Sequence, residues 1–129
     1  MISENIISII EKLSEKTHSN LVEWNKSSGV DGFKLVLKVG SISIDKFFTS
    51  DENCWIMDLT ILNERGETIE RYLKSQVEEV EGYNYLETFY SLVRRKYLKA
   101  DETIKNLLDE LDNKDLSQPL ENNPEENLV

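Results

Sequence analysis

The sequence predicts an α+β fold: an antiparallel β-meander of four to five strands, flanked by an N-terminal helix and a C-terminal helical region. Three observations predict it. Apolar residues recur at helical spacing in residues 3–18 and again in residues 83–111. Between these regions, apolar and polar residues alternate as they do in half-buried strands. Short segments rich in Gly, Asn and Ser divide the alternating region into pieces of strand length.

The first helix is expected to begin after Ser3, which can cap it, and to end between His18 and Asn20. Its apolar side is formed by isoleucines and one leucine at spacings of three and four: Ile6, Ile9, Ile10 and Leu13. From Leu21 to Asn25 the spacing changes to two, which predicts a short strand. Residues 26–32 contain Ser, Gly and Asp, and they predict a loop.

The first hairpin is expected to turn at Gly40 and Ser41, because a type II′ turn needs positive φ only at its first central residue. This turn would place the alternating apolar side chains of the core side of both strands on one face. The pairs it predicts are Val39 with Ile42, Leu37 with Ile44 and Phe33 with Phe48. A polar loop at residues 49–53 then leads to the next strand.

The second turn is expected at residues 63–66, where Asn comes first and Gly last, as in a type I turn followed by a left-handed glycine. A bulged hairpin with Asn63 opposite Glu67 keeps the core side apolar and is therefore preferred. It predicts Ile61 opposite Ile69, Met57 opposite Leu73 and Arg71 opposite Leu59 on the core side. A four-residue loop would instead place Thr68, Glu70 and Tyr72 on that side.

The C-terminal region is expected to be helical over residues 83–111, after an irregular connection at residues 76–82. One long helix and two helices with a break near Ala100 both fit the pattern, and Asp101 could cap the second. A single domain is expected to span residues 1–111. Residues 112–129 hold both prolines and five acids against one lysine, so they are expected to form an acidic disordered tail.

Charge and cysteine content exclude several classes of protein. The net charge of −10 argues against a surface that binds nucleic acid or anionic lipid as a whole. The single cysteine, Cys54, excludes an intramolecular disulfide and indicates the reducing cytoplasm. Because no apolar run is long enough to span a bilayer, and acids stand where a signal peptide has bases, neither membrane insertion nor secretion is expected.

No combination of residues predicts catalysis, a metal or a cofactor. His18 is the only histidine and stands at a helix end, and Cys54 has no neighbouring histidine. The glycines form no phosphate-binding loop, and the acidic run at Glu78, Glu79 and Glu81 lacks the spacing of a calcium loop. The aromatic residues, Trp24 among them, are expected in the core rather than in a ligand pocket.

Two surfaces are candidates for binding. The sheet face opposite the core is unusually apolar, so either a partner or the C-terminal segment 104–111 is expected to cover it. Its candidate partner-binding residues are Val36, Phe47, Ile56 and Tyr72. The second surface is a basic cluster in this acidic chain, where an anion could bind to Arg94, Arg95 and Lys99. Such a cluster can also simply be a solvated face that complements the helix dipole.

These observations predict a small, non-enzymatic cytoplasmic interaction module, such as an adaptor, an inhibitor or an immunity-type factor. Its partner would be another protein or a second copy of the chain. The alternative is a protein that binds a phosphate-bearing ligand, a nucleotide or a nucleic-acid backbone, through residues 94–99. Nucleic acid is the less expected partner because of the overall negative charge.

Overall fold

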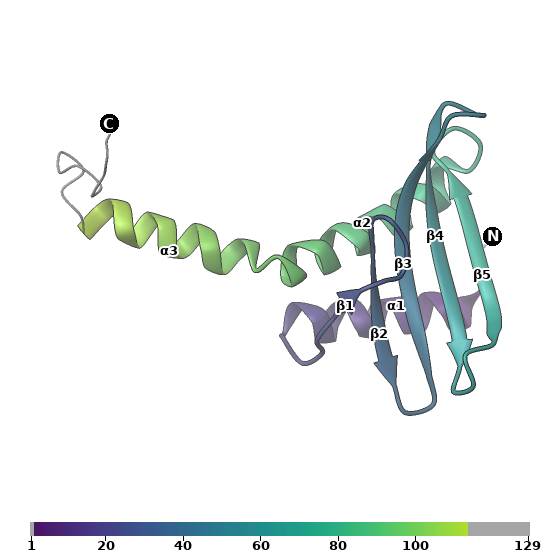
Figure 1. Ribbon diagram of the computed structural model, residues 1–129, viewed down its shortest axis with the longest axis horizontal. Coiled ribbons are helices and arrows are strands. Elements are labelled where there is room, and N and C mark those ends of the chain that lie inside the picture. The colour runs from purple at the N-terminus through teal and green to yellow at the C-terminus, as the bar shows by residue number, and fades with distance from the viewer. Residues whose placement is uncertain (1, 114–129) are drawn as a thin grey trace. The chain divides into compact units, whose positions relative to one another are not determined.

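The computed structural model describes residues 2–113 and confirms the predicted α+β class (Figure 1). The chain consists of two compact units: the first ends at Leu98 and the second begins at Lys99. The first unit contains two helices and an antiparallel sheet of five strands in the order β1-β2-β3-β4-β5. Its elements are α1 (Glu4–His18), β1 (Asn25–Lys26), β2 (Gly32–Leu37), β3 (Gly40–Thr49), β4 (Cys54–Asn63), β5 (Thr68–Ser75) and α2 (Val80–Tyr97). The second contains α3 (Ala100–Asn113).

The core lies between one face of the sheet and the helices α1 and α2, which lie on the same side of it (Figure 1). α1 begins after Ser3 and ends at His18, as predicted, although the Ser3 side chain makes no capping hydrogen bond. The apolar periodicity of each helix matches the residues that it buries. The buried apolar residues at the centre are Ile6, Ile10 and Leu13 of α1, Leu86, Phe89 and Val93 of α2, and Ile44, Met57 and Leu59 of the sheet.

The turn between β2 and β3 differs from the prediction. Leu37 pairs with Gly40 and Leu35 with Ile42, so the turn is formed by residues 38–39, and the pairs predicted from a Gly40-Ser41 turn are wrong. Gly40 does not have a positive φ. A Cβ at this position would collide with the backbone carbonyl oxygen of Leu62 on β4, so the glycine serves the close approach of two strands.

The turn between β4 and β5 forms as predicted, but the strand that follows it does not. The amide of Asn63 donates to the carbonyl of Glu67 at 2.9 Å, and Gly66 has a φ of +83°. The register then shifts, because Leu62 pairs with Thr68 and Ile61 with Glu70, which leaves Ile69 as an extra residue in β5.

This bulge turns every later side chain of β5 to the opposite face. Arg71 lies opposite Thr60, and Tyr72 lies opposite Leu59 on the core side. The predicted pairs of Ile61 with Ile69 and of Met57 with Leu73 are therefore wrong, and so is the placement of Arg71 on the core side. The consequence is an aromatic ring against the core and a guanidinium group away from it.

The C-terminal helical region is broken near Ala100, one of the two predicted possibilities. α2 ends at Tyr97, Lys99 has a left-handed φ of +54°, and α3 begins at Ala100. Asp101 therefore lies in the first turn of α3 and is not its cap. The first two residues of the predicted tail belong to α3, and residues 114–129 lie outside the described part of the chain. None of the described helices has the length and apolar composition needed to cross a membrane.

Candidate functional site

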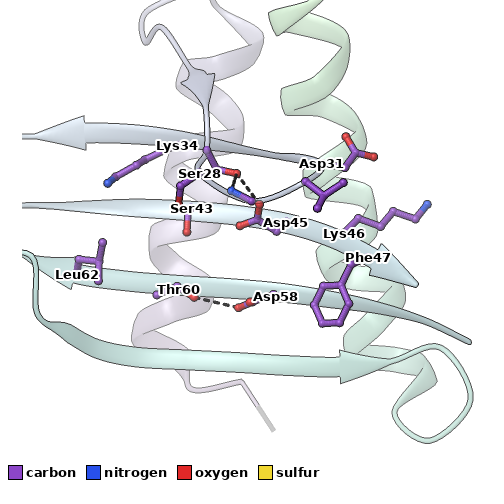
Figure 2. A pocket seen from close by; sticks show the side chains of 13 residues that line it. Ser28, Asp31, Lys34, Ser43, Asp45, Lys46, Phe47, Asp58, Thr60 and Leu62 are labelled. Carbon is purple, nitrogen blue, oxygen red and sulfur yellow. Dashed lines mark hydrogen bonds between the residues drawn. The ribbon is translucent and has the colours of Figure 1, made fainter. Parts of the chain in front are cut away.

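The sheet face directed away from α1 and α2 is the best candidate for a binding surface, and we call it the open face. Its side chains follow from the strand register, because paired residues point to the same side. One row contains Lys34, Ser43, Thr60 and Arg71, and the next contains Asp45, Asp58 and Leu73. Figure 2 shows the labelled members of both rows on the side of the sheet away from the helices.

A groove of about 390 Å³ runs along the open face, where the loop of residues 27–31 folds over β3 (Figure 2). Carboxylates, hydroxyls, two lysines and three apolar side chains line it. Its lining residues are Ser27, Ser28, Gly29, Val30, Asp31, Lys34, Ser43, Asp45, Lys46, Phe47, Asp58, Thr60 and Leu62.

Hydrogen bonds fix the loop to β3. The Lys46 amide donates to the Asp31 carbonyl at 3.0 Å, and the Ser27 hydroxyl donates to the Asp45 carboxylate. A Cβ at Gly29 or at Gly32 would collide with that carboxylate. Both glycines are therefore needed for the loop to approach Asp45 as closely as it does.

The two central carboxylates of the groove have different electrostatic surroundings. Asp58 is buried and accepts two hydrogen bonds from Arg71, at 2.8 and 3.2 Å, and one from Thr60 at 2.9 Å. Asp45 forms no ion pair within residues 2–113. Burial raises the pKa of Asp45, and the nearby Asp58 and Asp31 carboxylates raise it further, against the hydrogen bond from Ser27. Asp45 is thus a partly desolvated negative charge that faces the groove.

Asp45→Asn should therefore leave stability at neutral pH unchanged or increase it. An asparagine oxygen still accepts the Ser27 hydrogen bond, while the charge that is costly to bury is removed. A carboxyl group with a raised pKa in the folded state stabilises the fold below its unfolded pKa, and this contribution is lost as the pH rises through the folded pKa. The parent should thus lose stability relative to Asp45→Asn as the pH rises from 3 to 7.

Urea unfolding of both proteins across this pH range measures the difference. Ser43→Ala serves as the control, because it changes a groove residue without removing a charge, and its difference from the parent should be far less pH-dependent. A parent that gains stability over Asp45→Asn with rising pH would show instead that Asp45 has a favourable ionic partner.

The predicted partner-binding residues are only partly brought together. Val36 and Phe47 lie on the open face and are 66% and 37% exposed. Ile56 points to the same face but is only 9% exposed, so its substitution tests folding rather than binding. Tyr72 was expected on this face and lies on the opposite one, because of the bulge at Ile69. Leu73, which sequence reasoning placed in the core, is exposed on the open face instead.

The predicted anion-binding residues do not share one helix. Arg94 and Arg95 are exposed in the last turn of α2, whereas Lys99 follows the end of that helix and has a left-handed φ. The C-terminal turn of a helix carries a partial negative charge, which favours these cations themselves rather than a bound anion.

The residues considered for catalysis have ordinary structural surroundings. Cys54 is buried, with its Sγ 3.5 Å from the Ser75 hydroxyl. His18 is exposed at the last position of α1. Within residues 2–113, no group of three or more His, Cys, Asp or Glu side chains is arranged to hold a metal ion.

Comparisons with protein-family models, with curated protein sequences and with solved structures found no match to this chain. A function must therefore be inferred from the surfaces of the chain itself. Among the surfaces of the first unit, the open face combines exposed apolar residues, a groove and a desolvated charge.

Proposed function

We propose that this protein is a small, non-enzymatic interaction module that binds a protein partner through its open face. The observation that carries this proposal is the set of exposed apolar side chains Val36, Phe47 and Leu73 on a face that neither helix of the first unit covers. Exposed apolar residues along one side of a sheet are typical of a surface that another molecule buries.

The groove favours a partner that places a basic side chain, surrounded by apolar side chains, against it. Asp45 is already partly desolvated and forms no ion pair within the described residues, so a lysine or arginine from a partner gains an attraction that water screens weakly. Phe47 lines the same groove and offers an apolar contact beside the carboxylate. A net charge of −10 also favours rapid encounter with a cationic protein.

The roles that fit these properties are those of an adaptor, an inhibitor or an immunity-type factor. Each works by occupying a surface of another protein and needs no catalytic residues. A second copy of the chain is the less favoured partner, because it would bring two equally acidic surfaces together. We place the protein in the reducing cytoplasm, since its only cysteine is buried and forms no disulfide.

The test is a pull-down from extracts of the native host, with nuclease added and at low and moderate salt. A stoichiometric protein partner is expected with the parent chain and should be lost with the double variant Val36→Asp, Phe47→Asp. Val39→Asp is the matched control, because it makes the same valine-to-aspartate change at an exposed position in the β2–β3 turn, and it should retain the partner. Thermal unfolding of all three proteins checks that each remains folded.

Two results would contradict the proposal. Recovery of nucleic acid alone, released by moderate salt, would transfer the function to the basic residues Arg94, Arg95 and Lys99. A dimer mass in light scattering that becomes monomeric in the double variant would make a second copy the occupant of the open face.

A further inference from the structure

The helix α3, considered by itself, carries a continuous apolar stripe. Its first apolar residue is followed by others three, four and seven positions later, which places them on one side of the helix. Each of them is between 49% and 56% exposed, and no residue of α3 is buried. They are Ile104, Leu107, Leu108 and Leu111.

A helix of this length needs a surface to pack against. Isolated helices shorter than about 12–15 residues are marginal in water, and most helical stability in proteins comes from packing of the apolar face. α3 has 14 residues and buries none of them. Contact of its stripe with an apolar surface would therefore stabilise the helix itself as well as the complex.

The charges on the remaining sides of α3 indicate what kind of surface that is. Five acids stand against one lysine, Lys105, whose ammonium group lies 3.2 Å from the Asp109 carboxylate. The acids are Asp101, Glu102, Asp109, Glu110 and Asp112. Such a helix pairs best with a surface whose rim is basic.

Neither a second copy nor the groove on the open face offers such a rim. Two copies of α3 would bring like charges together, and each chain carries a net charge of −10. The groove on the open face contains the carboxylates of Asp31, Asp45 and Asp58, which have the same sign as α3.

We propose that α3 is a docking helix whose apolar stripe lies in an apolar groove, bordered by Lys and Arg, on another protein. The helix-in-groove mode of recognition uses this spacing of anchor residues. The proposal rests on the proposed function in that both require a protein partner. It assigns a second surface, separate from the open face, and names the chemistry of its target.

The test uses the full chain and a synthetic peptide as the probe. The peptide has about three heptads with Leu at positions a and d and Lys at e and g, and so presents an apolar seam with a basic rim. A matched peptide has Glu at e and g. Hydrogen exchange should show fast exchange of the α3 amides in the chain alone and protection when the Lys peptide is added. The Glu peptide should protect them far less.

Variants decide whether the stripe is responsible, because an acidic chain attracts many cationic peptides. Leu107→Ala with Leu108→Ala should weaken binding of the Lys peptide about tenfold or more, as loss of a buried interface anchor does. Leu21→Ala is the control, since it removes an exposed leucine from the first unit, and it should bind like the parent. Fluorescence anisotropy with a labelled peptide measures each dissociation constant.

The double variant Val36→Asp, Phe47→Asp separates this proposal from the proposed function. It should bind the Lys peptide like the parent even though it loses the partner of the open face.

Three results would overturn the proposal. If the α3 amides are strongly protected without peptide, the stripe is already covered. If the Leu107, Leu108 variant binds the peptide as tightly as the parent does, binding occurs elsewhere. If light scattering gives a dimer that this variant dissociates, a second copy is the occupant.

Discussion

Replacement of Trp24 by alanine is expected to lower the free energy of unfolding by about 3–5 kcal/mol, as loss of a buried large aromatic residue does. Trp24 is 5% exposed, and its ring packs edge-to-face on Phe89 with centroids 5.8 Å apart. Its Nε1 donates a hydrogen bond of 2.9 Å to the hydroxyl of Thr17, which is itself buried. The variant therefore leaves both a cavity and a buried hydroxyl without its partner.

Urea unfolding followed by circular dichroism measures this effect without relying on the fluorescence of the residue removed. Trp55→Ala is the matched control, because Trp55 is 40% exposed and lies outside the helix-covered core. Trp55→Ala should lower the free energy of unfolding clearly less than Trp24→Ala does, although it also removes the contact with the Phe48 ring. Equal losses in the two variants would show that Trp24 does not join the end of α1 to α2 as described.

Gly40→Ala is expected to lower the free energy of unfolding by about 1–3 kcal/mol, the usual effect of forcing an extra carbon into a packed interior. The added Cβ would meet the carbonyl oxygen of Leu62, which belongs to the backbone of β4 and cannot rotate away. β3 and β4 would therefore have to separate at the end of their ladder, where Gly40 pairs with Asn63.

Two further variants identify the cause. Val39→Ala in the exposed turn should change stability by no more than about 0.5 kcal/mol, as surface substitutions do. Gly40→Asn should be at least as harmful as Gly40→Ala, because it also adds a Cβ. If Asn were clearly better tolerated than Ala, a positive φ rather than a close approach would be the reason for glycine, since Asn adopts left-handed conformations more readily.

The fold class and most of the elements could be predicted because burial is periodic. The boundaries were less exact: the strand expected at residues 21–25 is β1 at Asn25–Lys26, and α2 begins at Val80 rather than at residue 83. α1 presents Ile6, Ile10 and Leu13 to the core at helical spacing, and the alternation in β2 and β3 matches the buried faces of these strands. These patterns depend on local geometry alone. A single sequence therefore contains enough information to identify them.

The register of the first hairpin could not be predicted, because alternation is compatible with several registers. Ile42 was expected opposite Val39 and pairs with Leu35. Since four is an even number, this shift leaves every side chain on the same face, and the apolar pattern cannot distinguish the two pairings. The bulge at Ile69 has the opposite effect, because one extra residue exchanges the faces of Tyr72 and Leu73.

The groove of the open face was also beyond prediction from the sequence. The segment of residues 27–32 contains Ser27, Gly29 and Gly32, which indicate a loop but not where it folds. The hydrogen bond from Ser27 to Asp45 joins two residues that are 18 positions apart in the sequence. The two glycines of the segment were the only signal available in the sequence. The structure shows that both lie against the Asp45 carboxylate.

The extra residue in β5 also affects how the sheet resists aggregation. β5 is the last strand of the sheet within residues 2–113, so the backbone groups on its outer side have no neighbouring strand there and can recruit another extended chain. The bulge at Ile69 interrupts that row of groups, and the charged residues Glu70 and Arg71 follow it directly. Bulges and charges of this kind discourage strand addition and fibril growth. Association along this border of the sheet is therefore disfavoured.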